Sequence, residues 1–195
     1  MPLVSGAAEG AVCCIGGDSC HFTLKGQERR RARGGQSRRR PLNGRVPSGL
    51  VILYATVSGN AEQLALAAAQ ALRAHGHVAE VHNAADFPAA RLREYRAALL
   101  IVSTWGEGEP PPDAADFFAA LEGEPSLELR NLNYAVLALG SSMYRDFCAS
   151  GRRVDEDLAR HGARRLLDRV ECDTKFKADF ERWLGRVQEA LQKLS

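Results

Sequence analysis

The chain has 195 residues, 45% of them hydrophobic and 26% charged, with a formal net charge of +2. That length allows one ordinary domain, and that composition can build a core of normal size. No apolar run approaches the ~20 residues needed to cross a bilayer, and the first residues lack the charged-then-apolar pattern of a secretory signal.

Basic residues are concentrated in residues 1–48, which hold nine Lys and Arg residues against three acids, a net charge of +6. The remaining 17 basic and 21 acidic groups give residues 49–195 a net charge of −4. Residues 1–48 show no sustained apolar periodicity, so we expect a disordered basic tail there. A targeting segment and a mis-assigned translation start are alternative interpretations. The arginine clusters would also suit nucleic acid or an anionic membrane, but we expect no nucleic-acid partner and no membrane span.

The 5 cysteines are an odd number and are not spaced as a disulfide framework. They favour a reducing compartment, so we expect a cytoplasmic protein. A metal site at Cys13, Cys14, Cys20 and His21 matches no zinc pattern well, and we expect no metal.

At Gly49 the pattern changes to alternating apolar runs and helix-forming stretches. Strands are expected at residues 50–54, 78–82, 97–103, 134–139 and 166–172. Helices are expected at residues 61–75, from Asp113 to about Glu122, over roughly 150–161 and over 176–194. This alternation predicts an α/β fold with right-handed crossovers, in which helices cover both faces of a parallel sheet. Five strands suit the doubly wound order 2-1-3-4-5, a three-layer αβα arrangement.

In that strand order, ligands bind beyond the C-terminal ends of strands 1, 3 and 4, where the order switches. The loop after the first strand reads Thr56-Val57-Ser58-Gly59-Asn60-Ala61-Glu62. It offers short polar side chains, a glycine that lets the backbone approach closely, and the N–H groups of a helix start. That combination binds phosphate without a lysine. The alternative is that Ser58 and Asn60 only cap the helix.

The loops after the third and fourth strands each present an aromatic side chain. Two glycines and three prolines fix a tight turn after Trp105, and Tyr144 follows a glycine and two hydroxyl side chains. The alternative for Trp105 is packing on the following helix. Taken together, the three loops predict a clamp for a planar phosphorylated ring.

These loops resemble those of the flavodoxin-like FMN domain of the diflavin reductases, above all the NADPH–sulfite reductase flavoprotein subunit. The matching stretches are residues 56–62, 103–111, 137–140 with Tyr144, Phe147 and Cys148, and 165–173. The resemblance covers essentially all of residues 49–195. Gly140-Ser141 stands where related reductases commonly have Gly-Asp, and in this it is similar to the same position of the stand-alone MioC-type flavodoxins. The position of Trp105 is often occupied by Tyr or Gln in relatives. These departures imply a changed flavin potential and affinity more than a loss of binding.

The resemblance implies a five-stranded flavodoxin-like sheet with FMN as the cofactor, and it assigns cofactor-binding roles residue by residue. The phosphate would be held by Thr56, Val57, Ser58, Gly59, Asn60 and Ala61. One face and edge of the ring would be covered by Ser103, Thr104, Trp105, Gly106, Glu107 and Gly108. The other face would be covered by Tyr144, on a loop shaped by Leu139, Gly140, Ser141, Phe147 and Cys148, with Asp173 as an acidic neighbour.

The resemblance also implies a function. Diflavin reductases continue into FAD- and NADPH-binding modules, which this sequence lacks, so we expect an electron-transfer flavoprotein without a catalytic acid, base or nucleophile of its own. Its partners would be a flavin reductase as donor and a haem, Fe–S or other acceptor protein, steered by Glu107, Glu109 and Asp113. Alternatively, these acids are simply solvated. Alternative functions are a direct NAD(P)H:acceptor reductase, a component of a sulfite reductase-type diflavin enzyme, and a flavin-free signalling or scaffold domain.

Overall fold

The structure, a computed structural model, describes residues 49–123 and 127–194. The predicted tail with Cys13, Cys14, Cys20 and His21 lies outside the described residues. Predicted strands form β1 (Leu50–Ala55), β2 (Ala79–Asn83), β3 (Ala97–Ser103) and β4 (Asn133–Leu139), each within one residue of its expected bounds. The helices are α1 (Asn60–Ala74), α2 (Ala115–Gly123), α3 (Ala149–Arg160) and α4 (Lys177–Gln192).

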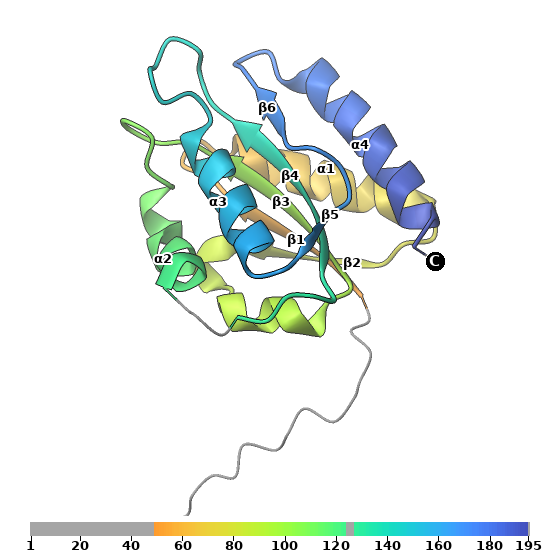
Figure 1. The fold of residues 1–195 in the computed structure, drawn as a ribbon. Helices are drawn as coiled ribbons and strands as arrows, with labels where there is room; N and C mark the ends of the chain where they lie inside the picture. Colours follow the sequence, from red (N-terminus) through yellow and green to blue (C-terminus); the bar gives the residue numbers. More distant parts are fainter. Residues whose placement is uncertain (1–48, 124–126, 195) are drawn as a thin grey trace, which may run out of the picture. The chain divides into compact units, whose positions relative to one another are not determined.

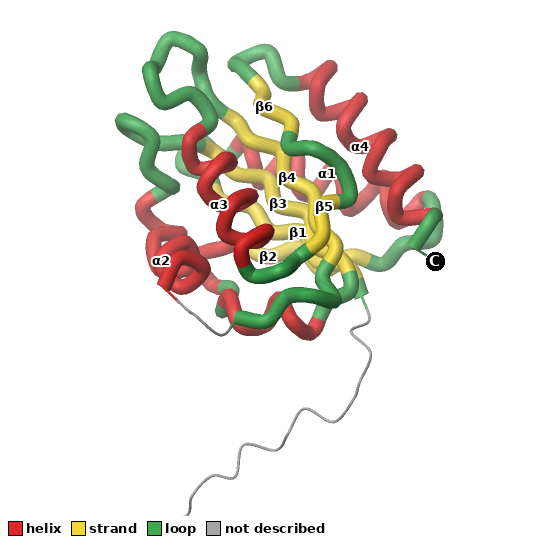
Figure 2. Tube along the Cα trace, viewed as in Figure 1, coloured by secondary structure: helices red, strands yellow, loops and turns green. Residues whose placement is uncertain are grey.

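The strands pair in parallel in the order β2-β1-β3-β4-β5, as predicted (Figure 1). β5 (Arg164–Arg165) and β6 (Val170–Cys172) both pair with β4. Helices lie on both faces of the sheet, which makes three layers (Figure 2). The chain leaves β1 for β2 on one side and then crosses to β3 on the other, so the C-terminal ends of β1 and β3 flank the point where the strand order reverses.

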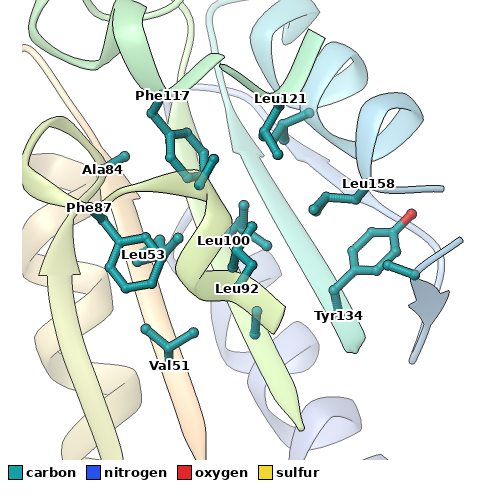
Figure 3. Close-up of a cluster of buried hydrophobic side chains, with 14 of the residues drawn as sticks. Val51, Leu53, Ala84, Phe87, Leu92, Leu100, Phe117, Leu121, Tyr134 and Leu158 are labelled. Carbon is teal, nitrogen blue, oxygen red and sulfur yellow. The ribbon is translucent and has the colours of Figure 1, made fainter. Parts of the chain in front are cut away.

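Side chains of the strands alternate between two cores, one on each face of the sheet. On one face, β1 and β3 contribute Val51, Leu53 and Leu100, which pack against residues of α2 and α3 such as Phe117 and Leu158 (Figure 3). This core also receives residues from the short 3-10 segments η1 (Ala84–Asp86), η2 (Ala89–Glu94) and η3 (Pro112–Ala114). α1 and α4 cover the other face. Fully buried central strands explain the continuous apolar runs of the sequence.

Helix α3 lies unusually close to the sheet because Gly151 faces Ala138 of β4. A Cβ atom at Gly151 would lie 2.2 Å from the Cβ of Ala138, so only glycine permits this approach. The beginning of α3 is therefore held directly against the end of β4.

Two predicted elements differ from the structure. The predicted fifth strand, 166–172, is wrong over residues 166–169, which lie outside the ladder. Between the pairs Tyr134–Arg165 and Leu137–Val170, the outer strand has four residues where β4 has two, which makes a bulge. The predicted helix after Asp113 begins instead at Ala115, because the preceding prolines favour a 3-10 turn over residues 112–114.

Candidate functional site

A cavity of about 410 Å³ lies at the C-terminal ends of β1, β3 and β4, where the strand order predicted a ligand site. It brings together predicted residues from three loops: Ser58, Asn60, Ser103, Thr104, Trp105, Gly106, Leu139, Gly140, Ser141, Tyr144, Phe147 and Cys148. Other predicted residues belong to the same loops or follow β6 but do not line the cavity: Thr56, Val57, Gly59, Ala61, Glu107, Gly108 and Asp173. The cavity is also lined by Asp146, Thr174 and Phe176, which the sequence did not single out.

The first loop ends in a helix start without a side-chain cap. Gly59 is the N-cap of α1, with a left-handed φ of 82°, and its N–H donates to Thr56 Oγ1 at 3.0 Å. No side chain accepts a cap hydrogen bond at this end of α1, so the interpretation of Ser58 and Asn60 as caps is wrong. The first N–H groups of an α-helix have no acceptor within the helix, and with the helix dipole they form an anion site.

The second loop is a tight hairpin that presents Trp105. The N–H of Trp105 donates to the carbonyl of Glu109 at 2.8 Å, and the N–H of Gly108 donates to the carbonyl of Trp105 at 3.1 Å. The carboxylate of Glu109 accepts a further bond from the N–H of Glu107 at 2.8 Å. Trp105 remains 50% exposed while lining the cavity, so it does not bury itself against the following helix as the alternative required.

The start of α3 holds this hairpin in place. Ser150 is buried, and its hydroxyl donates to the carbonyl of Glu109 at 2.7 Å and also lies 3.2 Å from the carbonyl oxygen of Gly108. Its N–H donates to Thr104 Oγ1 at 3.3 Å. The wall of the cavity that carries Trp105 is therefore attached to α3.

The third loop, residues 140–148, presents Tyr144, which is 61% exposed. It is tied to the segment after β6, because Asp173 accepts bonds from the N–H of Ser142 at 3.2 Å and from the Ser142 hydroxyl. The Ser142 hydroxyl, then the N–H groups of Thr174 and Ser142, lower the pKa of Asp173 below its ordinary value. Asp173 thus organises the third loop, a role that explains why it borders the cavity without lining it.

Cys148 closes the inner side of the third loop as a packed thiol. It is fully buried at the N-cap of α3, and its Sγ donates to the carbonyl of Ala138 at 3.5 Å. Burial raises the pKa of Cys148 to about 12, and that of Cys172 likewise to about 12. Thiols with such pKa values are unreactive at neutral pH, so the two cysteines shape the site without chemistry of their own.

The residues of the cavity suit a flat ring with a phosphate. Two half-exposed aromatic side chains, Trp105 and Tyr144, come from separate loops to the same cavity. The lining of the cavity, within the described residues, includes no Lys or Arg, so backbone N–H groups at the start of α1 and the polar groups of Ser58 and Asn60 would bind the phosphate. Over residues 49–123 and 127–194, no helix is long and apolar enough to span a membrane, and no group of three or more His, Cys, Asp or Glu side chains is arranged to hold a metal.

The fold and the cavity together define a doubly wound α/β protein with a candidate ligand site at the switch point of the sheet. The family model described as Flavodoxin matches residues 52–183, and the chain belongs to the flavodoxin family. The family implies a flavin cofactor, and FMN is the usual one.

Similar proteins of known sequence and structure agree with this assignment. The sulfite reductase [NADPH] flavoprotein alpha-component of Vibrio parahaemolyticus is 37% identical over 150 residues, 74% of this chain and 24% of that protein. The same component of Bacillus subtilis is 36% identical over 146 residues, 75% of this chain and 24% of that protein. The chain thus spans about a quarter of the length of these relatives.

Solved structures with this fold include oxidised flavodoxin 1 from Bacillus cereus, with a TM-score of 0.67 and 31% identity over 76% of this chain and 100% of that one. A flavodoxin from Streptococcus pneumoniae matches with a TM-score of 0.67 and 26% identity, covering 75% of this chain and 99% of that one.

Proposed function

We propose that this chain binds one FMN in the cavity and transfers electrons between a separate reductase and an acceptor protein. The observation that carries the proposal is the meeting of two half-exposed aromatic side chains with a helix start that has no side-chain cap. A flat ring that carries a phosphate fits both the aromatic side chains and the helix start. The ring covers the exposed apolar surface, and the phosphate accepts hydrogen bonds from the free N–H groups of the helix.

Each wall of the cavity has a distinct task in this proposal. Trp105 and Tyr144 would cover the two faces of the ring and exclude water, while Ser58 and Asn60 would bind the phosphate together with the start of α1. When bound, the isoalloxazine ring would supply the redox chemistry. The carboxylate of Glu107, on the Trp105 hairpin, would disfavour added negative charge on the ring and so lower its reduction potential.

The rim of the cavity suits a transient protein partner with a basic surface. Val57, 50% exposed, and Met143, 91% exposed, add apolar contact area beside the aromatic side chains. The second loop carries two exposed carboxylates, Glu107 and Glu109, and residues 49–195 have a net charge of −4. Such surfaces steer a basic partner to a small, salt-sensitive interface.

A second candidate function is that of one component of a sulfite reductase-type system. The observation in its favour is the 36–37% identity to the sulfite reductase flavoprotein alpha-component over a quarter of that protein's length. In this version the donor would be an FAD- and NADPH-binding module on another polypeptide. Reduction of the reconstituted protein by such a module, with no reduction by NADPH alone, supports either electron-carrier version. Rapid bleaching by NADPH alone would support a direct NAD(P)H:acceptor reductase instead.

We further propose that residues 49–195 form the FMN-binding domain and that residues 1–48 are dispensable for it. A chain that begins at Gly49 should bind FMN as tightly as the full chain. Loss of binding on removing residues 1–48 would contradict this division.

The cytoplasm is our proposal for the location of the protein. The buried thiols of Cys148 and Cys172, which form no disulfide, support a reducing compartment.

The binding site itself is tested with Trp105→Ala, Tyr144→Ala and the control Leu66→Ala. Leu66 is also apolar and 55% exposed, but it lies on the outer face of α1, away from the cavity. Each aromatic substitution should raise the dissociation constant for FMN about tenfold or more, since stacking on a flat base or ring contributes roughly 1–3 kcal/mol. The control should not change it. Equal affinities in all three variants would contradict the ring clamp.

A further inference from the structure

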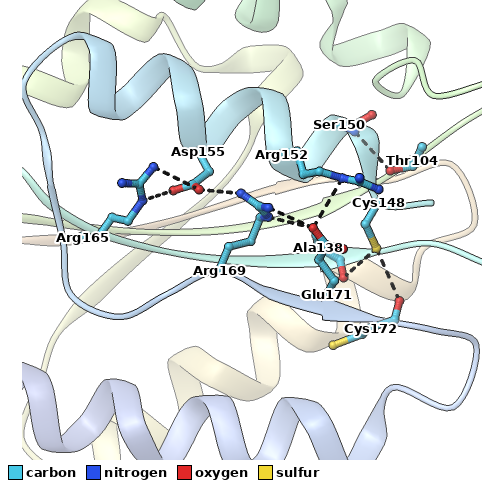
Figure 4. Close-up of polar contacts among 10 residues, drawn as sticks. All are labelled: Thr104, Ala138, Cys148, Ser150, Arg152, Asp155, Arg165, Arg169, Glu171 and Cys172. Atoms are coloured by element: carbon cyan, nitrogen blue, oxygen red, sulfur yellow. Dashed lines mark hydrogen bonds and ion pairs between the residues drawn. The ribbon is translucent and has the colours of Figure 1, made fainter. Parts of the chain in front are cut away.

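A cluster of arginine and carboxylate side chains occupies the bulge between β5 and β6, outside the cavity (Figure 4). Its centre is Asp155 of α3, which is only 4% exposed. Arg165 donates to both carboxylate oxygens of Asp155, at 2.7 Å and 3.2 Å. The hydroxyl of Tyr134 donates to Oδ1 of Asp155 at 2.8 Å. Several partners thus compensate the burial of this charge.

Arg169 connects this cluster to β6. Its Nη1 donates to Oδ2 of Asp155 at 2.6 Å, while its Nε and Nη2 both lie 3.0 Å from Oε1 of Glu171. Glu171 is the middle residue of β6, and its Oε1 also lies 3.4 Å from Nε of Arg152 on α3. Arg169 and Glu171 therefore attach β6 to α3 through side chains, as Figure 4 shows.

β6 is a strand of only three residues, yet the loop that carries Tyr144 depends on it. The N–H of Gly140 donates to the carbonyl of Cys172 at 3.0 Å, and Sγ of Cys148 lies 3.7 Å from the same carbonyl oxygen. Ser142 bonds to Asp173, the residue that follows β6. A shift of β6 along or away from the sheet would therefore move the Tyr144 loop with it.

Helix α3 consequently holds both walls of the cavity. At its first turn, Ser150 binds the Trp105 hairpin directly. At its middle, Asp155 holds β6 through Arg169, and β6 holds the Tyr144 loop. The distance between the two aromatic loops is thus set through one rigid element.

We propose that Arg169 is a positioning residue for the flavin site: through Asp155 and Glu171 it fixes β6, and so the Tyr144 loop, relative to α3 and the Trp105 loop. This inference rests on the proposed FMN site for its functional consequence, although the coupling itself exists without a ligand. Supporting contacts of this kind matter because a bound group tolerates little displacement of the residues around it.

The test is Arg169→Met, which removes the connection from β6 to Asp155 and leaves only the longer Arg152–Glu171 pair between β6 and α3, with no charge left without a partner. In this variant Asp155 keeps its ion pair with Arg165, and Glu171 keeps its ion pair with Arg152. The control is Arg153→Met, on the same helix as Asp155, which breaks an exposed ion pair with Glu122 of α2, away from the bulge. The conservative variant Arg169→Lys keeps the positive charge and should restore part of any loss.

Three readouts are needed. In the protein without FMN, hydrogen exchange at residues 140–147 and 173–175 should become about tenfold faster in Arg169→Met and stay unchanged in Arg153→Met. The dissociation constant for FMN, measured well below the unfolding temperature, should rise about tenfold, the lower end of the loss found when residues that hold metal ligands in place are replaced. The absorption bands of bound FMN should also shift, because Tyr144 no longer covers the ring in the same way.

The outcomes separate this inference from the proposed function. Unchanged exchange in Arg169→Met would overturn the positioning role, whether or not FMN binds. A lower unfolding temperature with unchanged FMN affinity and spectrum would also overturn it, because Arg169 would then only stabilise the fold. A wild-type protein that takes up no FMN would overturn the proposed function, while the exchange experiment would still decide the coupling.

Discussion

Gly59→Ala should weaken FMN binding far more than it destabilises the fold, and Gly76→Ala provides the matched control. The two glycines lie at opposite ends of α1, both have a φ of +82°, and a Cβ atom at either position would meet no atom within 4 Å. An alanine in the left-handed region costs about 1–2 kcal/mol at either site. At roughly 2–4 °C per kcal/mol for a domain of this size, both unfolding temperatures should fall by similar amounts.

Binding distinguishes the two positions. Gly59 is the N-cap of α1, directly before the first N–H groups of the helix, where the proposed site has the FMN phosphate, so a methyl group added there would crowd that phosphate. We expect the dissociation constant for FMN to rise at least tenfold, about 1.4 kcal/mol, in Gly59→Ala and to remain unchanged in Gly76→Ala. Calorimetric unfolding and quenching of flavin fluorescence measure the two quantities. Equal FMN affinities in the two variants would refute the assignment of the phosphate to this helix start.

Three further predictions concern side chains around the cavity. Cys148 and Cys172, each with a pKa of about 12, should have a thiolate fraction of only about one in ten thousand near pH 8. Iodoacetamide should therefore leave both cysteines unlabelled until urea unfolds the domain, and peptide mapping measures the labelling. Because folding lowers the pKa of Asp173, this carboxylate stabilises the fold above about pH 4, and its contribution is lost as the pH falls through the folded-state pKa. In Ser142→Ala the carboxylate loses a donor, and an NMR titration should find the pKa of Asp173 closer to its ordinary value. Gly151→Ala places a methyl group 2.2 Å from a Cβ on β4, so urea unfolding should show a loss of about 1–3 kcal/mol, and unchanged stability would contradict the close packing of α3.

The sequence predicted the sheet well because its central strands are buried on both faces. Continuous apolar runs such as residues 97–103 leave no ambiguity about strand or loop, and alternation with helices gives the order 2-1-3-4-5. The prediction of a ligand site followed from that order, because the ends of adjacent parallel strands bring distant loops together. Ser58, Trp105 and Tyr144 accordingly line one cavity.

The split of the fifth strand could not be predicted from local pattern. Residues 166–172 contain Leu166, Leu167 and Val170, which favour a continuous strand. The bulge is accompanied by ion pairs from Arg169 to Asp155 on α3, a contact that no local rule gives. Tertiary contacts override local preference here, as they commonly do for short edge strands.

The sequence also did not indicate that the segment after β6 forms a wall of the cavity. Thr174 and Phe176 line it, although the predicted strand order points only to the loops after strands 1, 3 and 4. β6 pairs directly with β4, so its C-terminal end lies at the same edge of the sheet. The carboxyl end of a strand that pairs with β4 can therefore supply residues to the cavity, although that strand does not flank the switch point.

The most direct test of this account is a titration of the flavin-free protein with FMN, followed by visible absorption, with riboflavin, which lacks the phosphate, as the comparison. We expect tight uptake of one FMN per chain with shifted flavin bands, and much weaker uptake of riboflavin. A protein that binds no flavin would contradict the proposed FMN site. Equal affinity for FMN and riboflavin would leave the ring clamp standing but contradict the phosphate site at the start of α1.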